Sequence, residues 1–103
     1  MIIFHITDHH TWQNAVTYGI YNADSLESEG YIHCCMPDQL DFVIKEWFPG
    51  NTGLIILEIN TDCLKSDLKF ENLTGGKTQF PHVYGPINLD AITRHYPISN
   101  ERN

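Results

Sequence analysis

The sequence predicts a single α+β domain that combines a sheet with two main helices. The chain has 103 residues, well below the length at which chains divide into several domains. Its most regular stretch, 54–59, is a continuous β-branched run, typical of a central strand covered on both faces except near Glu58. Two other stretches, 9–18 and 37–48, carry apolar residues at helical spacing. These observations predict one layered core.

A short strand and a capped helix are expected first. Residues 1–7 form a β-rich apolar run that suits a strand with a buried face. Asp8 can cap a helix from 9 to about 18, and Gly19 supplies its C-terminal stop. The inward stripe of this helix is expected to contain Trp12, Ala15, Val16 and Tyr18.

A polar loop, a second strand and a second helix follow. Residues 22–30 predict the loop, with room for one helical turn after Asp24. Residues 31–35 alternate as a strand does, and Pro37 suits the first turn of a helix that runs to about Phe48. Helical spacing relates Leu40, Val43, Ile44 and Trp47. The cores on the sheet faces are expected to include Trp12, Phe42, Val43, Trp47 and Ile56.

The second half of the chain is expected to be mostly extended. In order, it predicts a capped turn at 61–64, a weaker extended segment at 68–73, a loop at 74–77, an extended piece at 80–87, a turn at 88–91 and a strand at 92–98. The prolines in the piece at 80–87 suit an edge strand or a rigid turn. We therefore expect one domain over residues 1–98 and a frayed polar tail at 99–103.

Composition excludes several classes of partner. Six Lys and Arg against thirteen Asp and Glu give a net charge of −7, which repels phosphate backbones and argues against nucleic-acid binding. No apolar run approaches the roughly 20 residues that span a bilayer, and the first ten residues have neither a basic region nor a small-residue cleavage site. We expect a soluble cytoplasmic protein, whose oligomeric state the sequence leaves open.

The three cysteines do not form a disulfide framework, because they are few and odd in number. Adjacent Cys34 and Cys35 could form a vicinal redox couple, or one of them could serve a thiol enzyme with a histidine. However, the sequence shows neither Cys-x-x-Cys spacing nor an orienting Asn or Asp. We interpret all three as small buried thiols in a reducing cytosol.

Histidines are the unusual feature of so short a chain, which has six. His5 and His33 each lie on the polar-leaning face of an expected strand, so neighbouring strands would bring both to one cleft. His82 lies between two prolines, on a stiff backbone that would position a catalytic or binding group. Each could instead be a hydrogen-bonded structural histidine. A zinc site built from these three with a Cys or Glu is a further alternative, although no short ligand spacing supports it.

Five more residues are candidate contacts of the same cleft. Tyr31 and Tyr84 could stack on a flat ligand or donate a hydrogen bond. Glu71 could orient a ribose hydroxyl or act as a base. Ser25 could contact the ligand or cap a turn, and Gln39 could point back at the cleft from the second helix or lie on the surface.

Specific blocks of the sequence resemble a known family. They are Phe4-His5-Ile6-Thr7, Glu29-Gly30-Tyr31-Ile32-His33-Cys34 and Phe80-Pro81-His82-Val83-Tyr84-Gly85-Pro86-Ile87, together with the strand at 54–59 and with Trp12, Ala15, Gly19, Tyr21, Ser25, Leu26, Gln39 and Glu71. Over nearly its full length the chain resembles the domain of unknown function 952 family of small bacterial proteins. Cys35 departs from the serine usual there, which weakens any role for that side chain.

That family is similar to the ADP-ribosyltransferase-like fold, which implies a split, mainly antiparallel sheet with NAD in the cleft between its halves. The resemblance implies that His5 holds the NAD ribose. It leaves the stacking role between Tyr31 and His33, and the final polar role among Glu71, His82 and Tyr84. Fold analogy alone does not establish a reaction.

We therefore expect a nucleotide site. The favoured hypothesis is an NAD-like nucleotide bound in a histidine-lined cleft, with ADP-ribosyl transfer or NAD glycohydrolysis as its turnover. Because the chain has only six Lys and Arg, the phosphates would rest on backbone N–H groups and histidines. The alternatives are a small-ligand module without turnover and a histidine-based metalloprotein.

Overall fold

Strands and short helices alternate along the chain in the computed structural model, which describes residues 1–72 and 76–98. The helices are α1 (His9–Tyr18), α2 (Asp24–Glu29) and α3 (Leu40–Trp47). The strands are β1 (Ile2–Asp8), β2 (Ile20–Tyr21), β3 (Ile32–His33), β4 (Leu54–Asn60), β5 (Asp67–Asn72), β6 (Gln79–Tyr84), β7 (Ile87–Asn88) and β8 (Ile92–Pro97). Single 3-10 turns occupy Pro37–Gln39, Thr61–Cys63 and Leu89–Ala91. The protein is therefore a small α+β domain, as its composition of elements predicts.

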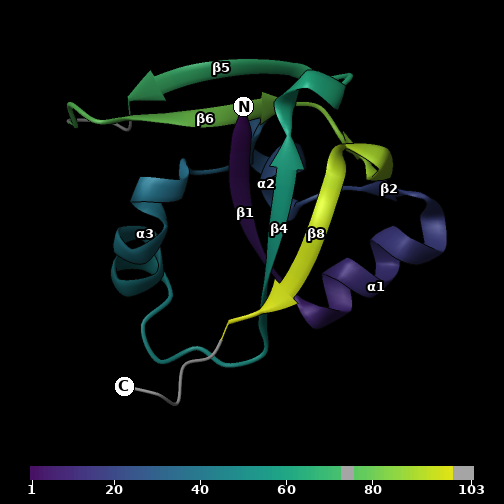
Figure 1. Ribbon diagram of the computed structural model, residues 1–103, viewed down its shortest axis with the longest axis horizontal. Coiled ribbons are helices and arrows are strands. Elements are labelled where there is room, and N and C mark those ends of the chain that lie inside the picture. The colour runs from purple at the N-terminus through teal and green to yellow at the C-terminus, as the bar shows by residue number, and fades with distance from the viewer. Residues whose placement is uncertain (73–75, 99–103) are drawn as a thin grey trace.

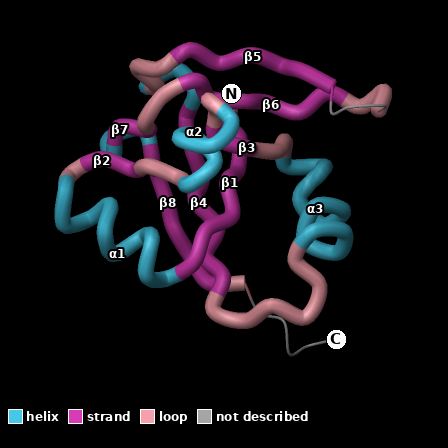
Figure 2. Tube along the Cα trace, turned by 180° about the vertical axis from the view of Figure 1, so that it is seen from behind, coloured by secondary structure: helices cyan, strands magenta, loops and turns pink. Residues whose placement is uncertain are grey.

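The strands form separate antiparallel sheets with the orders β1-β4-β8, β3-β6-β5 and β2-β7. The β5–β6 pair lies across one end of the β1-β4-β8 sheet, and α1 and α3 lie on opposite sides of that sheet (Figures 1 and 2). Phe4 and Cys35 exchange two backbone hydrogen bonds of 2.8 Å, which join β1 to the segment after β3. This junction brings the regions around His5 and His33 together.

Two apolar cores fill the two faces of the β1-β4-β8 sheet, because the strands alternate between them. On the α1 side, Ile3 of β1 packs with Leu57 and Ile59 of β4. On the α3 side, Ile6 packs with Val43 and several neighbours. The expected central strand at 54–59 is confirmed: β4 lies between β1 and β8 and is buried over most of its length, with Glu58 only half-buried.

The ends of α1 lie where the sequence predicts them. The Asp8 carboxylate accepts a hydrogen bond from the Thr11 backbone N–H at 2.7 Å, and Gly19 adopts the left-handed conformation with φ 83°, which glycine reaches without strain. The predicted inward stripe is only half right, because Val16 and Tyr18 are 52% and 78% exposed. Tyr18 is the last helical residue, where the chain turns away toward β2.

The apolar stripe of α3 also differs from the prediction. Val43 is buried, but Phe42 and Trp47 are 54% and 47% exposed, so the core does not enclose them. On a helix, residues 42 and 43 lie about 100° apart, and only one of them can face the sheet. Trp47 instead lines a pocket described below.

The piece at 80–87 is not an edge. β6 is the middle strand of β3-β6-β5. Pro81 is tolerated there because β3, the partner strand on one side, consists only of Ile32–His33. The Cys34 N–H donates to the Pro81 carbonyl at 3.0 Å, and Pro81 has no N–H to return that bond. The predicted strand 31–35 accordingly shortens to Ile32–His33.

Most remaining elements match expectation. The helical turn after Asp24 is a full short helix, the last strand begins at Ile92, and the turns at 61–64 and 88–91 are present. The two-residue strands β2 and β7 lack enough length to give a sequence signal. The predicted tail at 99–103 and part of the predicted extended segment and loop at 68–77 lie outside the described residues. No described helix is long and apolar enough to cross a membrane.

Candidate functional site

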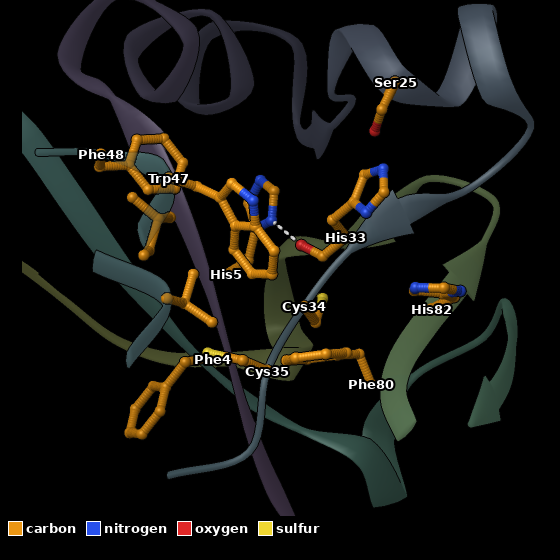
Figure 3. Close-up of a pocket in the computed structure, with 12 residues that line it drawn as sticks. Phe4, His5, Ser25, His33, Cys34, Cys35, Trp47, Phe48, Phe80 and His82 are labelled. Atoms are coloured by element: carbon orange, nitrogen blue, oxygen red, sulfur yellow. Dashed lines mark hydrogen bonds between the residues drawn. The ribbon is translucent and has the colours of Figure 1, made fainter. Parts of the chain in front are cut away.

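A pocket of about 390 Å³ lies where β1, the segment after β3, β6 and the end of α3 meet. Its size is within the range of small-ligand sites. Figure 3 shows Ser25, His33 and His82 on one side of it, and the rings of Trp47 and Phe48 on the other. Its lining consists of Phe4, His5, Ile6, Ser25, His33, Cys34, Cys35, Val43, Trp47, Phe48, Phe80 and His82.

His82 is held from the side of β5. Its ring is 2% exposed, and its Nδ1 lies 2.8 Å from Glu71 Oε1. A carboxylate can only accept, so Nδ1 carries the proton and donates to Glu71. The Tyr84 hydroxyl donates to the same oxygen at 2.6 Å. The hydrogen bonds from Tyr84 and then His82 lower the pKa of Glu71, so the carboxylate stays ionised. The bond between Tyr84 and Glu71 in turn raises the pKa of Tyr84 to about 12.

The other nitrogen of His82, Nε2, is buried and has no hydrogen-bond partner among the described residues. Most buried polar groups in proteins are paired, because an unpaired one loses its hydration without compensation. In the neutral form of the ring, with its proton on Nδ1, His82 presents Nε2 as an acceptor. This is the unusual atom of the site, and it belongs to a residue of the pocket wall.

Tyr31 covers His82 from the side of β3. Their rings are stacked, with centroids 4.2 Å apart and an interplanar angle of 19°. The Tyr31 ring also contacts the rings of His33 at 4.9 Å and Tyr84 at 5.3 Å. His33 has a further partner that is not part of this ring cluster, because its Nε2 lies 3.0 Å from a Glu29 carboxylate oxygen. Tyr31, Tyr84 and Glu71 thus lie beside His82 and not in the pocket lining, where the sequence hypothesis had placed one of the tyrosines.

His5 is engaged at both ring nitrogens. Its Nδ1 donates to the backbone carbonyl of His33 at 2.5 Å, and its Nε2 lies 2.7 Å from the Tyr21 hydroxyl. That hydroxyl is also 2.8 Å from Thr7 Oγ1. Burial lowers the pKa of His5 to about 4, so the ring is neutral at pH 7 and Nε2 accepts from Tyr21. His5 therefore reaches the pocket wall, but its nitrogens fix β1 to β3 and to Tyr21.

Of the two remaining predicted contacts, Ser25 and Gln39, only Ser25 lies at the pocket. Ser25 lines the pocket, and its hydroxyl donates to the Tyr31 carbonyl at 2.8 Å. Gln39 does not reach the pocket: its Oε1 accepts from the Met36 N–H at 2.8 Å and its Nε2 donates to the Gln79 carbonyl at 2.9 Å. The oxygen and the nitrogen of the Gln39 side-chain amide are therefore both hydrogen-bonded, and they connect the start of α3 to β6.

The two cysteines of the pocket wall are poor nucleophiles. Both are buried, and burial raises the pKa of the Cys34 thiol and raises that of Cys35 to about 12. A thiol whose pKa lies far above its ordinary value is almost entirely protonated at pH 7, so almost no nucleophilic thiolate is present. Among residues 1–72 and 76–98, no group of three or more His, Cys, Asp and Glu side chains is placed to hold a metal ion. The thiol and zinc alternatives thus lack a suitable site there.

Sequence reasoning missed the aromatic wall and Tyr21. Phe4, Trp47, Phe48 and Phe80 line the pocket, although Trp47 was expected in the core. A signal existed at the end of α3, since the adjacent aromatic residues 47 and 48 before Pro49 cannot both face one core. Tyr21 was among the residues of the family resemblance, but it lies in a two-residue strand with no periodicity, so its role could not be predicted.

Comparisons with known proteins agree with this architecture. The crystal structure of protein CC0527 from Caulobacter crescentus, a structural genomics target, has a TM-score of 0.87 and 27% sequence identity, over 99% of this chain and 90% of that one. The solution NMR structure of CC0527 gives a TM-score of 0.84 and 27% identity, over 98% and 87%. The sequence has no match among curated proteins. The family model described as protein of unknown function (DUF952) matches residues 6–95, and the chain therefore belongs to the DUF952 family.

Proposed function

We propose that the pocket binds a small flat ligand, and that this ligand is the nicotinamide nucleoside end of an NAD-like nucleotide. The carrying observation is His82, whose Nε2 is buried and unpartnered in the described structure while Nδ1 is fixed by Glu71. A ligand N–H or O–H that reached this acceptor would satisfy it. The rings of Trp47, Phe48 and Phe80 supply flat apolar surface at the same pocket.

The arrangement also suggests how such a nucleotide would be oriented. None of the described residues that line the pocket is Lys or Arg, so no cationic side chain of this part of the wall would neutralise a pyrophosphate. The base and ribose would therefore enter, and the phosphates would remain at the opening. His5 would support the site by joining β1 to β3, in place of the direct ribose contact that the family resemblance implies.

Calorimetric titration with NAD and with nicotinamide riboside tests the proposal. We expect both to bind wild type, and the riboside to retain most of the affinity. His82→Asn keeps an N–H donor for Glu71 but removes Nε2, so it should weaken binding about tenfold. His10→Ala, an exposed histidine on α1, is the matched control and should bind as wild type does. Absence of binding by wild type would reject the function.

A second candidate is turnover at the nicotinamide ribose, which the Tyr84–Glu71–His82 chain favours. A histidine oriented by a carboxylate, with its second nitrogen free to accept, is suited to general-base catalysis. His82 would take a proton from water as the oxygen bonds to the ribose C1′ carbon, the C–N bond would break, and nicotinamide would leave with its electron pair. The proton would then pass to solvent.

This step assigns Glu71 a positioning role, because its Oε1 already accepts from both His82 and Tyr84. Nicotinamide release measured by chromatography should fall in Glu71→Gln while calorimetric binding remains, and the pH profile of the residual activity should change. Binding by wild type without any nicotinamide release would leave a ligand-binding module and reject the enzyme.

A further inference from the structure

We propose that the pocket selects a flat ring that carries a positive charge, such as a pyridinium, over a neutral ring of the same shape. This inference rests on the proposed function and concerns the charge of the ligand. It predicts that the oxidised, cationic nicotinamide ring is the form that the protein recognises.

The first observation is the aromatic wall. Phe4, Trp47, Phe48 and Phe80 line the pocket together. The Trp47 and Phe80 rings are at an edge-to-face angle of 69° with centroids 5.9 Å apart, and Phe42 contacts Trp47 from outside at 5.7 Å. Aromatic faces are electron-rich and attract cations, and tryptophan does so most strongly.

The second observation is the exposure of Trp47. It remains 47% exposed although it lies beside an apolar core. Because the large indole is partly exposed to water at the pocket wall, a ligand ring that covers it would bury apolar surface, which favours binding. Neither of the neighbouring rings, Phe42 and Phe80, covers it by parallel stacking, since both meet it at steep angles. An aromatic surface is therefore available to a ligand at this end of the pocket.

The third observation is that the described lining contains neither Lys or Arg nor Asp or Glu. None of the lining residues is Lys or Arg, as far as the described part of the chain extends, and burial keeps His5 neutral at pH 7. No lining residue is Asp or Glu either, so no carboxylate would pair with the cation and the aromatic rings would be its main partners. The net charge of −7 adds a diffuse attraction for cations.

A matched pair of probes isolates the charge. 1-Methylnicotinamide, methylated on the ring nitrogen, is a pyridinium cation, and 3-methylbenzamide has a ring of the same shape with the same methyl and carboxamide groups but without the charge. By isothermal titration calorimetry, wild type should bind the cation about 3- to 30-fold more tightly. Trp47→Leu should reduce this ratio toward one, and His10→Ala should retain it. The ratio should persist at high salt, because salt screens only the diffuse attraction.

The two tryptophans of the chain allow a second readout. Trp12→Phe leaves Trp47 as the only indole, and its fluorescence should be quenched saturably by 1-methylnicotinamide. Trp47→Phe leaves Trp12, which is buried and packs on His95, and should show no saturable quenching. Circular dichroism melting confirms that each variant folds.

The outcomes separate the two claims. If both probes bind wild type equally, charge selection is wrong while the proposed function stands. If Trp47→Leu keeps the full preference, the selection does not come from the Trp47 face, and the inference from the aromatic wall is overturned. If neither probe nor nicotinamide riboside binds, the proposed function fails and this inference fails with it. Preference for the cation that depends on Trp47 supports both.

Discussion

Glu71 and His82 are diagonal neighbours on one face of the β5–β6 pair, with Glu71 Oε1 2.8 Å from His82 Nδ1. The register pairs His82 with Lys69, two residues before Glu71, and diagonal side chains are within reach of one another on such a face. The contact fixes the ring proton of neutral His82 on Nδ1, which determines what Nε2 can bind.

The first prediction concerns that proton. Long-range ¹H–¹⁵N correlation spectra of the free protein near pH 8 should show His82 protonated at Nδ1 and bare at Nε2. In Glu71→Ala the acceptor is removed, so the Nε2-protonated form should increase. A wild-type ring protonated at Nε2 would contradict the assignment, and His10 provides an exposed reference signal in the same spectra.

The second prediction is acid destabilisation through His5. Its pKa is lowered to about 4 in the folded protein, against about 6.5 in the unfolded chain. The unfolded state therefore binds a proton first, and stability should fall as the pH decreases from about 6.5 to about 4, by roughly 3 kcal/mol. Urea unfolding at several pH values measures the loss.

Two variants test whether the loss of stability in acid comes from His5. His5→Asn should be less stable at neutral pH but should lose less stability on acidification, whereas His10→Ala should follow wild type. The lowered carboxyl pKa values of Asp8 and Glu71 act at lower pH, since they start from the ordinary acidic range. A flat wild-type curve between pH 6.5 and 4 would be inconsistent with a neutral buried His5.

The third prediction compares a buried core residue of β4 with an exposed aromatic residue of α3. Ile56 is 5% exposed in β4, so Ile56→Ala should cost about 2 to 5 kcal/mol by creating a cavity. Phe42 is 54% exposed on α3, and Phe42→Ala should cost about 0.5 kcal/mol. Chemical denaturation gives both values, and a comparable loss in the two variants would show that the expected core membership of Phe42 was right.

The fourth prediction concerns thiol reactivity. The expectation that all three thiols are buried is wrong for Cys63, which is exposed at the end of the 3-10 turn after β4. Cys34 and Cys35 are buried, and their thiol pKa values are raised. Iodoacetamide should alkylate only Cys63 in the native protein and all three cysteines after unfolding, as followed by mass spectrometry. Rapid native labelling of Cys34 or Cys35 would reopen the thiol-enzyme alternative.

Much of the fold could be predicted because the signals are local. Asp8 and Gly19 mark both ends of α1, and the run at 54–59 marks the central strand. The exposure of Val16 and Phe42 could not be predicted, because helical spacing does not say which part of a stripe the sheet covers. The middle position of β6 was also missed, since the tolerance of Pro81 depends on where its short neighbour β3 ends.

The site was predictable in part for the same reason. Strand parity predicted that His5 and His33 share one cleft, and the stiff backbone around His82 added it to the same site. All three line the described pocket. What each imidazole does there depends on partners far away in the sequence: Tyr21 and the His33 carbonyl for His5, and Glu71 for His82. These pairings follow from tertiary contacts, and no sequence spacing encodes them.

The most direct test of the account is a titration of ¹⁵N-labelled protein with nicotinamide riboside, followed by ¹H–¹⁵N correlation spectra. We predict saturable shifts of the backbone signals of His33, Cys34, Phe80 and His82 and of the Trp47 indole, which belong to the pocket. Signals from the far side of the molecule, such as His10 and Asn14 of α1, should not move. An unchanged spectrum at saturating riboside, or shifts confined to α1, would contradict a nucleoside site in this pocket.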